Sequence, residues 1–276
     1  MAAEKVLVFG RGYLGGRLTE HFEAEISPAD VTDLQAVRAE LDRTKPDVII
    51  NAAAKTRTAD LEKPENQAEA YRVNVQGAAN LALAASERGI YMVQISTAMM
   101  FDGPGITESS LPEPKSYYAW TKAWADAQLV PLMGEGVLIA RIHTPLSKFA
   151  SPRNLLTKLQ GFSSVADVPA SLTVVEDFLE ALAALVQKRS SGIYNLVNPG
   201  SISMYRIAST MQEQGRIAAD KVIKPASREE LDRMVRESGG AFQPFPILET
   251  KKLEAEGISM RPAEEAVRAC INEYQS

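Results

Sequence analysis

The sequence predicts an α/β fold built on a doubly wound parallel sheet of the Rossmann type, with a small C-terminal lobe. Two observations support this fold class. Short apolar runs alternate with amphipathic helical segments through the first half of the chain, and the first run ends in a glycine-rich turn. Strands that alternate with helices build a parallel sheet, covered by helices on both faces and joined by right-handed crossovers.

The predicted strands are short and apolar, as expected of strands that are buried on both faces. They cover residues 6–9, 24–27, 47–51, 91–96 and 137–142. Apolar residues at helical spacing predict helices between these strands, over residues 14–22, 34–41 and 65–88. The third helix ends at Gly89, a residue typical of helix C-termini.

The second half of the chain is less regular. We predict helices over residues 152–160, 174–187, 204–214 and 263–274, and a strand over residues 193–197. Residues 220–240 are charged and end in two glycines, which predicts a mobile loop or a weak helix. We assign residues 1–145 to the Rossmann domain. Most of residues 146–276 should form a small substrate-binding lobe without a core of its own, and some segments should return to the first domain.

Composition and charge exclude several classes of protein. The formal net charge is −5, with acids and bases interspersed, so the chain lacks the basic face of a nucleic-acid binder. The single cysteine, Cys270, excludes an internal disulfide framework and fits a reducing compartment. Two histidines are too few to suggest a metal site. No run is long enough for a spanning helix, and the N-terminus resembles a strand rather than a signal peptide. We therefore expect a cytoplasmic protein without membrane partners.

The first chemical motif is a GxGxxG turn between the first predicted strand and the first predicted helix. It consists of Gly10, Arg11, Gly12, Tyr13, Leu14 and Gly15. The first glycine allows a tight turn, the second lets the backbone approach a pyrophosphate, and the third lets the helix pack closely on the strand. The helix N-terminus offers free N–H groups to the anion. This context predicts a dinucleotide site. The alternative is a glycine-rich turn in some other α/β protein.

The choice between the two nicotinamide cofactors depends on the end of the second strand. Sites that prefer NAD(H) carry an acid there, about 20 residues beyond the glycine motif, which binds the ribose hydroxyls. Here the strand ends at Ser27 with no acid, and Arg11 could reach a 2′-phosphate. We expect NADP(H) to be preferred and NAD(H) to be possible. Asp30 and Val31 would lie near the adenine, unless Asp30 only caps the following helix.

A second motif places Tyr118 and Lys122 four residues apart, on one face of a helix. Tyrosine has an ordinary pKa of about 10, and a nearby ammonium lowers it, which suits the phenol to acid–base chemistry. Ser96 and Thr97 end the fourth predicted strand, at the sheet edge where such folds bind ligands. A hydroxyl there could orient a substrate carbonyl. We predict Thr97, Tyr118 and Lys122 as catalytic residues; the alternative is a Tyr/Lys pair on a helix surface.

Together these motifs resemble the extended short-chain dehydrogenases/reductases, and more narrowly their dTDP-4-dehydrorhamnose reductase branch. The likeness is greatest to the reductase half of the plant-type nucleotide-rhamnose synthase epimerase/reductase. Besides the motifs above, it rests on Asn51-Ala52-Ala53-Ala54, Asn74-Val75-Gln76-Gly77, Phe101-Asp102-Gly103, Ser151-Pro152-Arg153-Asn154, Thr157-Lys158, Gly192-Ile193-Tyr194-Asn195 and Asn198-Pro199-Gly200.

The resemblance implies an oxidoreductase that uses NADPH to reduce the 4-keto group of a nucleotide-linked 6-deoxyhexose. Tyr118 would donate the proton, Lys122 would tune its pKa and hold the nicotinamide ribose, and Thr97 would hold the carbonyl. Further cofactor contacts are expected from Ala52, Ala53 and Ala54.

Substrate contacts are expected near the ends of the fourth and fifth predicted strands and at the start of the next helix. Cationic and polar side chains there would bind a diphosphate through charge-assisted hydrogen bonds. The candidates are Ser96, Met99, Arg141, His143, Arg153, Asn154 and Lys158. Three of them have a structural alternative: Arg141 in an ion pair, His143 as a core histidine, and Met99 as a wall of the pocket or core.

Two alternative functions stay open. In the bifunctional plant-type enzymes, a cysteine follows the catalytic threonine and works with a lysine in 3,5-epimerisation. Lys158 matches that lysine, but Met99 stands in place of the cysteine and has no proton to exchange, which favours a plain reductase. The other alternative is a non-catalytic, dinucleotide-binding regulatory subunit. Trp120 and Trp124, one helical turn apart, could form part of a homodimer face.

Overall fold

The computed structural model describes residues 4–238 and 240–275, and the chain divides into two compact units. The first unit comprises Met1–Met100, Pro114–Arg141 and Leu182–Tyr194, and the second comprises Phe101–Glu113, Ile142–Ala181 and Asn195–Ser276. The sequence places residues 101–113 in the first domain, whereas the structure places them in the second unit.

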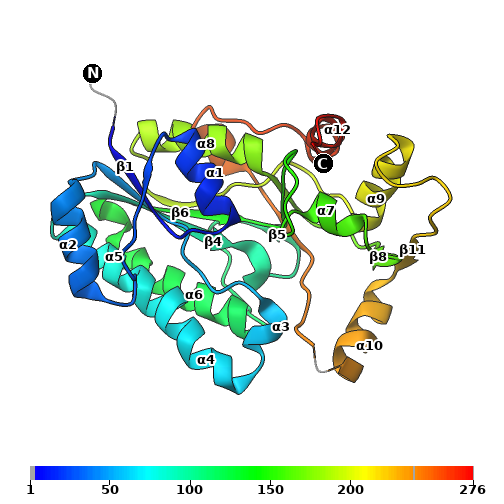
Figure 1. The fold of residues 1–276 in the computed structure, drawn as a ribbon, viewed down its shortest axis with the longest axis horizontal. Helices are drawn as coiled ribbons and strands as arrows, with labels where there is room; N and C mark the ends of the chain where they lie inside the picture. Colours follow the sequence, from blue (N-terminus) through cyan, green and yellow to red (C-terminus); the bar gives the residue numbers. More distant parts are fainter. Residues whose placement is uncertain (1–3, 239, 276) are drawn as a thin grey trace. The chain divides into compact units, whose positions relative to one another are not determined.

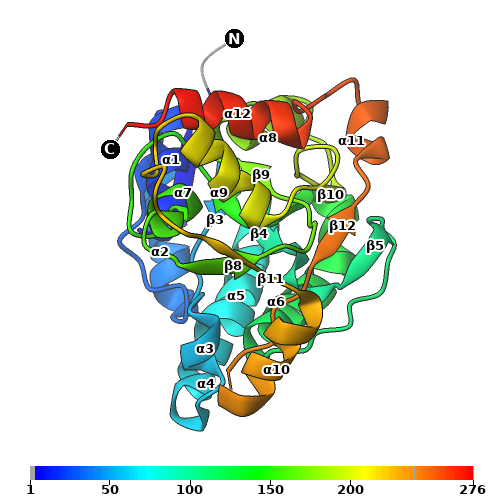
Figure 2. The same cartoon turned by 90° about the vertical axis from the view of Figure 1, so that its right-hand side faces the viewer.

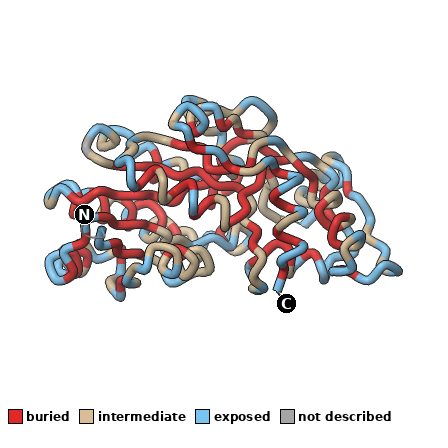
Figure 3. Tube along the Cα trace, turned by 90° about the horizontal axis from the view of Figure 1, so that it is seen from above, coloured by how far each residue is buried: buried red, intermediate tan, exposed pale blue. Residues whose placement is uncertain are grey.

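The first unit is built on a six-stranded sheet in the order β10-β6-β4-β3-β1-β2 (Figure 1). The strands are β1 (Val6–Phe9), β2 (Glu25–Ile26), β3 (Val48–Asn51), β4 (Tyr91–Thr97), β6 (Val137–Ile142) and β10 (Gly192–Asn195). The strand β1 pairs in parallel with both β2 and β3, and β3 pairs in parallel with β4. Every residue of β1, β3, β4 and β6 is buried, as their apolar sequences predict (Figure 3).

The chain order reverses between β1 and β3, because β2 lies on one side of β1 and β3 on the other. Folds of this class bind ligands beyond the carboxyl ends of the strands at such a reversal. Phe9 pairs with Asn51 at this end of the two strands. The glycine motif follows Phe9 and the predicted alanine segment follows Asn51, so the topology brings the two segments together.

Helices cover both faces of this sheet. In Figure 1, α1 (Tyr13–His21) lies on one face, and α2 (Leu34–Thr44), α5 (Gly77–Ser86) and α6 (Tyr117–Leu129) lie on the other. Short helical segments complete the unit: α3 (Thr58–Leu61), α4 (Pro64–Tyr71), η1 (Arg72–Gln76), η2 (Ala98–Met100) and η3 (Val130–Glu135). The predicted helix over residues 65–88 is thus α4, η1 and α5 in succession. A π-helical turn, η1, interrupts it, and apolar spacing does not reveal such a turn.

The second unit consists of short strand pairs and helices (Figure 2). Its strands pair as β5 (Gly103–Ile106) with β12 (Pro246–Leu248), β8 (Ser164–Ala166) with β11 (Lys224–Ala226), and β7 (Pro145–Leu146) with β9 (Thr173–Val174). Its helices are α7 (Leu155–Leu159), α9 (Met204–Glu213), α10 (Arg228–Ser238), α11 (Lys251–Ala255) and α12 (Ala263–Asn272). The helix α8 (Val175–Gln187) begins in this unit and ends in the first.

The second unit has its own hydrophobic core, so the prediction of a small lobe without one is wrong. Apolar side chains from α7, α9 and α12 pack together with those of several strands. Sequence spacing underestimates this core because its members come from segments that are each short and lie far apart in the chain.

Of residues 220–240, predicted as a mobile loop or a weak helix, the described part contains a short strand and a helix; residue 239 lies outside the described residues. The two elements are β11 and α10, and α10 buries none of its described residues. An ion pair holds the start of α10: Arg228 donates two hydrogen bonds to the Asp102 carboxylate, at 3.1 and 2.8 Å. Within the described residues, no helix is both long and apolar enough to cross a membrane.

Candidate active site

The glycine motif joins β1 to α1 and requires glycine at two positions. Gly10 has φ +108°, and a Cβ there would lie 2.5 Å from the Ala52 carbonyl carbon and the Ala53 nitrogen. A Cβ on Gly15 would lie 1.9 Å from the Gly10 carbonyl oxygen. Both positions are therefore closed to any larger residue. The predicted tight turn and close helix–strand packing are present.

The N-terminus of α1 is suited to an anion. Its N-cap residue is Gly12, which has no side chain to occupy the free N–H groups, and the first turn carries no acid. Unpaired N–H groups and the helix dipole together favour a phosphate at this position. Arg11 is exposed beside it, and Tyr13 and Leu14 are partly buried. This glycine cradle fits the diphosphate of a dinucleotide.

Asp30 and Val31, predicted near the adenine, lie after β2. The Asp30 carboxylate is exposed and accepts hydrogen bonds from the Thr32 backbone N–H and hydroxyl, both at 2.9 Å, which lower its pKa. It does not cap the next helix, because Asp33 does so by accepting from the N–H of Gln35. Val31 is buried, and a Cβ on Gly77 would lie 2.6 Å from its methyl group. Its side chain packs inside the protein.

Ala52, Ala53 and Ala54 follow β3 and are each partly exposed. The backbone of this segment is fixed at its start. Ala52 N–H donates to the Phe9 carbonyl at 2.8 Å, and Ala53 N–H donates to the Asn51 side chain at 3.1 Å. The segment is partly exposed and lies next to Gly10, which fits the predicted contact with a cofactor.

The helix α6 carries Tyr118 and Lys122, and it begins at a side-chain cap. The Ser116 hydroxyl accepts the Ala119 N–H at 3.2 Å. Tyr118 and Lys122 both point inward, and their side chains are 9% and 2% exposed. Lys122 Nζ donates to the Ile95 carbonyl of β4 at 2.8 Å. Thr97, at the end of β4, is hydrogen-bonded to Tyr118. The structure therefore brings together the three residues predicted as catalytic.

Burial dominates the acid–base properties of this pair. It raises the pKa of Tyr118 to about 12, against the opposing effect of the Thr97 hydrogen bond. It lowers the pKa of Lys122 to about 8, against the opposing charge of Asp126. Burial is thus the largest influence on the Tyr118 phenol, and the expected lowering of its pKa by Lys122 stays a prediction. The phenol is held neutral and can serve as an acid.

Ser96 and Arg141, both predicted as substrate contacts, instead contact a buried carboxylate. The Ser96 hydroxyl donates to Asp126 Oδ2 at 2.7 Å, and Arg141 Nε lies 3.7 Å from the same oxygen. All three residues are buried. The structural alternative for Arg141, an ion pair, is therefore correct. The sequence analysis did not identify Asp126 as a residue of the site, although its position four residues beyond Lys122 puts it on the same face of α6.

Met99 lies in η2 and is partly buried. It packs against the small apolar cluster that contains Tyr118, Leu61 and Ala70. This position agrees with the interpretation of Met99 as a wall beside the candidate catalytic residues.

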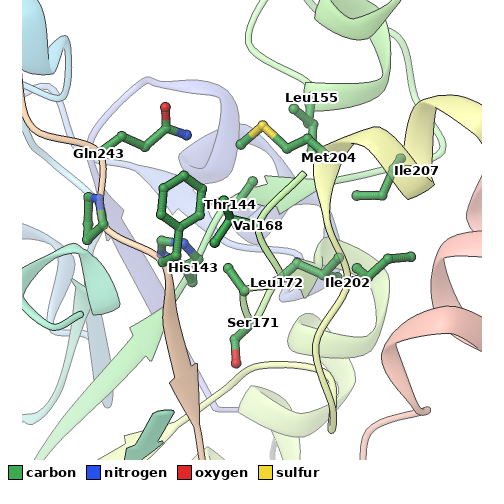
Figure 4. Close-up of a pocket in the computed structure, with 13 residues that line it drawn as sticks. His143, Thr144, Leu155, Val168, Ser171, Leu172, Ile202, Met204, Ile207 and Gln243 are labelled. Atoms are coloured by element: carbon green, nitrogen blue, oxygen red, sulfur yellow. The ribbon is translucent and has the colours of Figure 1, made fainter. Parts of the chain in front are cut away.

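The second unit contains a small pocket of its own that is partly open to solvent and has a cavity volume of about 20 Å³. In Figure 4, the amide of Gln243 and the side chain of Met204 point toward one another across it. The lining is mostly apolar, with a few polar groups. It consists of His143, Thr144, Leu155, Val168, Ala170, Ser171, Leu172, Ile202, Met204, Ile207, Gln243, Pro244 and Phe245.

His143 is the buried titratable group of this pocket. Its backbone N–H donates to Thr173 Oγ1 at 3.1 Å. Burial lowers the pKa of its imidazole to about 4, so that the ring is neutral at pH 7. Its Nδ1 is buried and has no hydrogen-bond partner among the described residues. His143 thus has a core position, in agreement with its structural alternative.

The remaining substrate candidates lie around α7. Asn154 is the N-cap of that helix: its Oδ1 accepts Leu156 N–H at 3.2 Å, and its Nδ2 donates to the Phe149 carbonyl at 2.8 Å. Asn154 is fully buried and makes these structural bonds, and its role as a substrate contact stays a prediction. Arg153 and Lys158 are exposed, and neither is among the residues that line the pocket.

Comparison with known proteins identifies the family of this chain. The sequence profile of the family described as "RmlD substrate binding domain" matches residues 4–276. A bifunctional dTDP-4-dehydrorhamnose 3,5-epimerase/dTDP-4-dehydrorhamnose reductase of Arabidopsis thaliana is 29% identical over 259 residues, which cover 82% of this chain and 84% of that protein.

Two solved structures share the fold over nearly the whole chain. The L780 UDP-rhamnose synthase of Acanthamoeba polyphaga mimivirus superimposes with a TM-score of 0.91 at 22% identity, covering 99% of this chain and all of that one. The dTDP-4-dehydrorhamnose reductase of Bacillus anthracis, solved with NADP, has a TM-score of 0.83 at 25% identity and covers 99% of both chains.

Proposed function

Since this chain belongs to the RmlD substrate-binding domain family, we propose that it reduces the 4-keto group of a nucleotide-linked 6-deoxyhexose with NADPH. Besides family membership, one observation supports the proposal. Thr97, Tyr118 and Lys122 lie together at the end of β4 and on the facing side of α6. They belong to the same unit as the glycine cradle, which fits a dinucleotide diphosphate.

The cofactor would be held by the glycine cradle at the start of α1, by the alanine segment after β3, and by Lys122. When bound there, NADPH supplies the hydride that reduces the carbonyl carbon. Arg11 and the absence of an acid directly after β2 support a preference for NADP(H), with NAD(H) also accepted. The Bacillus anthracis relative was solved with NADP, which agrees with this preference.

The residues of this chain would supply the proton and orient the carbonyl. The Thr97 hydroxyl donates a hydrogen bond to the carbonyl oxygen, and Tyr118 transfers its phenolic proton to that oxygen as negative charge develops. With its pKa raised to about 12, Tyr118 is protonated at neutral pH and ready to act as the acid. The Lys122 ammonium then stabilises the phenolate that remains.

The plain reductase is favoured over the bifunctional epimerase/reductase by Met99. Epimerisation next to a ketone requires a group that can remove and return a proton, and a thioether cannot do so. Lys158, the other residue implied for that reaction, is exposed on α7. We propose that a separate enzyme supplies the epimerised substrate.

The remaining substrate contacts are proposed in the second unit. His143 lines the pocket there, and its buried Nδ1 has no hydrogen-bond partner among the described residues. Arg153 and Lys158 are exposed cations that could bind a diphosphate. We further propose that the protein works in the cytoplasm and forms a homodimer.

The test is NADPH oxidation by the pure protein, offered a panel of nucleotide 4-keto-6-deoxyhexoses with and without an added 3,5-epimerase. We expect oxidation with at least one sugar, slower oxidation of NADH, and dependence on the added epimerase. The Tyr118→Phe variant should lose about 100-fold or more in kcat while still binding NADPH.

Two outcomes would count against the proposal. If no sugar is reduced although NADPH binds, the chain is the non-catalytic dinucleotide-binding subunit. If substrate that needs epimerisation is consumed without the added enzyme, the chain carries the epimerase activity despite Met99.

A further inference from the structure

Three residues that follow α12 lie along the loop that carries Arg153. This loop covers residues 147–154, between β7 and α7, and Arg153 is exposed on it. Glu273, Tyr274 and Gln275 form hydrogen bonds with the loop or with α7. We call these three residues the brace. All of these segments belong to the second unit.

We propose that the brace, and above all Tyr274, positions Arg153 to bind the diphosphate of the nucleotide sugar. Tyr274 is a positioning residue, because it acts through Arg153 and does not itself touch the substrate. This inference rests on the proposed function, in which Arg153 is a substrate contact. It also gives a role to Ser151 and Thr157, which belong to motifs of the family resemblance but have no part in the reduction described above.

The backbone of the brace pairs with the middle of the loop. Gln275 N–H donates to the Lys148 carbonyl at 2.8 Å, and Ala150 N–H donates to the Gln275 carbonyl at 3.0 Å. Phe149 and Gln275 thus form a parallel bridge. An ion pair between Lys148 and Glu273, at 2.7 Å, accompanies this pairing. The ion pair contributes little, because both of its side chains have access to water.

The side chain of Tyr274 connects the loop to the core of the second unit. Tyr274 is 4% exposed, and its ring packs in that core. Its hydroxyl shares a hydrogen bond of 2.7 Å with Thr157 Oγ1, which accepts the Ser151 N–H at 3.2 Å. The Ser151 hydroxyl oxygen accepts the Arg153 N–H at 3.3 Å. A chain of three hydrogen bonds therefore joins a buried phenol to the backbone of Arg153.

A fixed backbone matters at Arg153 because its side chain is free to move. In the part of the chain that the structure describes, this side chain forms no ion pair or hydrogen bond. Binding a diphosphate must order it, and this ordering costs free energy. A loop that is already held in place adds no second cost. The side chain of Asn154 holds residues 147 and 149, at the start of the loop, whereas the chain from Tyr274 reaches Arg153 itself.

The test is Tyr274→Phe, which removes the hydroxyl and keeps the ring. UDP and dTDP serve as probes of diphosphate binding, measured by calorimetry. We expect the Kd of the tighter probe to rise by roughly threefold to tenfold, as one hydrogen bond is lost. The KM for the sugar nucleotide should rise by the same factor. The kcat and the KM for NADPH should stay unchanged, because the loop affects substrate binding and not the chemical step.

Tyr91→Phe is the matched control. Tyr91 is also 4% exposed, and its hydroxyl donates to the Ser190 carbonyl, but it belongs to the first unit. It begins β4, at the opposite end of that strand from Thr97. Removing its hydroxyl should reduce stability without changing the affinity for either probe. The control therefore separates a general loss of stability from a loosened loop.

A second set of variants tests whether the brace acts through Arg153. Arg153→Ala should raise the Kd of the probe by roughly tenfold or more, because a charge-assisted bond is lost. In that background Tyr274→Phe should have no further effect, since the side chain that it positions is gone. Thr157→Val should behave like Tyr274→Phe, whereas Thr157→Ser keeps the hydroxyl and should keep the affinity.

Amide hydrogen exchange, followed by NMR, measures the loop without any ligand. The amides of Ser151 and Arg153 should be protected in the wild type, because both are hydrogen-bonded. Their exchange should be roughly threefold to tenfold faster in Tyr274→Phe and unchanged in Tyr91→Phe.

Three results would overturn the proposal: a wild type that binds neither probe, equal losses of affinity in Tyr274→Phe and Tyr91→Phe, or the same effect of Tyr274→Phe with and without Arg153. Unprotected Ser151 and Arg153 amides in the wild type would do so even if the variants fail to fold. A protein that shows the expected coupling but reduces no sugar would keep the brace and lose the reductase function.

Discussion

At the scale of single residues, the glycine cradle offers a matched pair of positions. Gly15 and Gly16 are neighbours in α1, yet a Cβ on Gly15 would meet the Gly10 carbonyl at 1.9 Å, whereas one on Gly16 would meet nothing within 4 Å. The same substitution should therefore have opposite effects at the two positions.

We expect Gly15→Ala to lower the free energy of unfolding by about 2–3 kcal/mol, because α1 must move away from β1. Its affinity for NADPH should also fall by roughly tenfold or more, since the cradle opens. Gly16→Ala should stabilise the protein by about 0.5–1 kcal/mol, as alanine favours the helix. Urea unfolding and NADPH titration measure both effects. Equal losses in the two variants would contradict the close contact at Gly15.

His143 should make stability depend on pH. Burial lowers its pKa to about 4, below the ordinary value of about 6.5 in an unfolded chain. Between these values the unfolded state binds a proton that the folded state does not. The contribution of the neutral ring to stability is therefore complete above pH 6.5 and is lost as the pH falls toward 4. We expect a loss of about 2 kcal/mol between pH 7 and pH 5.

Urea unfolding at pH 7 and pH 5 checks this expectation. The His143→Asn variant, which cannot take up the proton, should lack this part of the pH dependence. The same pH dependence in the wild type and the variant would show that His143 is not the group responsible.

At the scale of elements, two neighbouring residues at the start of α7, Arg153 and Asn154, differ in their structural setting. Asn154 caps this helix and also bonds to the loop before it, whereas Arg153 next to it is exposed. Sequence reasoning gave both residues the same role because they are adjacent in a polar motif.

We expect Asn154→Ala to reduce stability by about 2 kcal/mol, because it leaves buried backbone groups without partners. The KM for the sugar should change little. Asp33→Ala removes the exposed cap of α2 and should cost about 1 kcal/mol. Thermal unfolding and steady-state kinetics measure these effects. A large rise in KM with unchanged stability in Asn154→Ala would restore it as a substrate contact.

At the scale of the whole molecule, the proposed homodimer is the property to measure. Trp120 and Trp124 form an edge-to-face pair on α6, and both remain 36% or more exposed. Exposed aromatic side chains of this size are typical of protein interfaces. Sedimentation equilibrium should give twice the chain mass of 30.0 kDa, and Trp124→Glu should give the monomer. A monomeric wild type would contradict the dimer.

The sequence alone determined the Rossmann fold class, the glycine cradle and the proximity of Tyr118 to Lys122. Each depends on local rules: apolar periodicity, the need for glycine where no Cβ fits, and the one-turn spacing of residues four apart. These rules act within a few residues and do not depend on how distant segments of the chain pack together.

The remaining features depend on contacts that form only in the folded chain. The core of the second unit, the partner of Arg141 and the capping role of Asn154 depend on contacts between segments far apart in sequence or on which way a side chain turns. The burial of Tyr118 is another property that depends on tertiary contacts. Spacing reveals a neighbouring ammonium, but only packing shows how little water reaches the phenol, and burial is the larger effect.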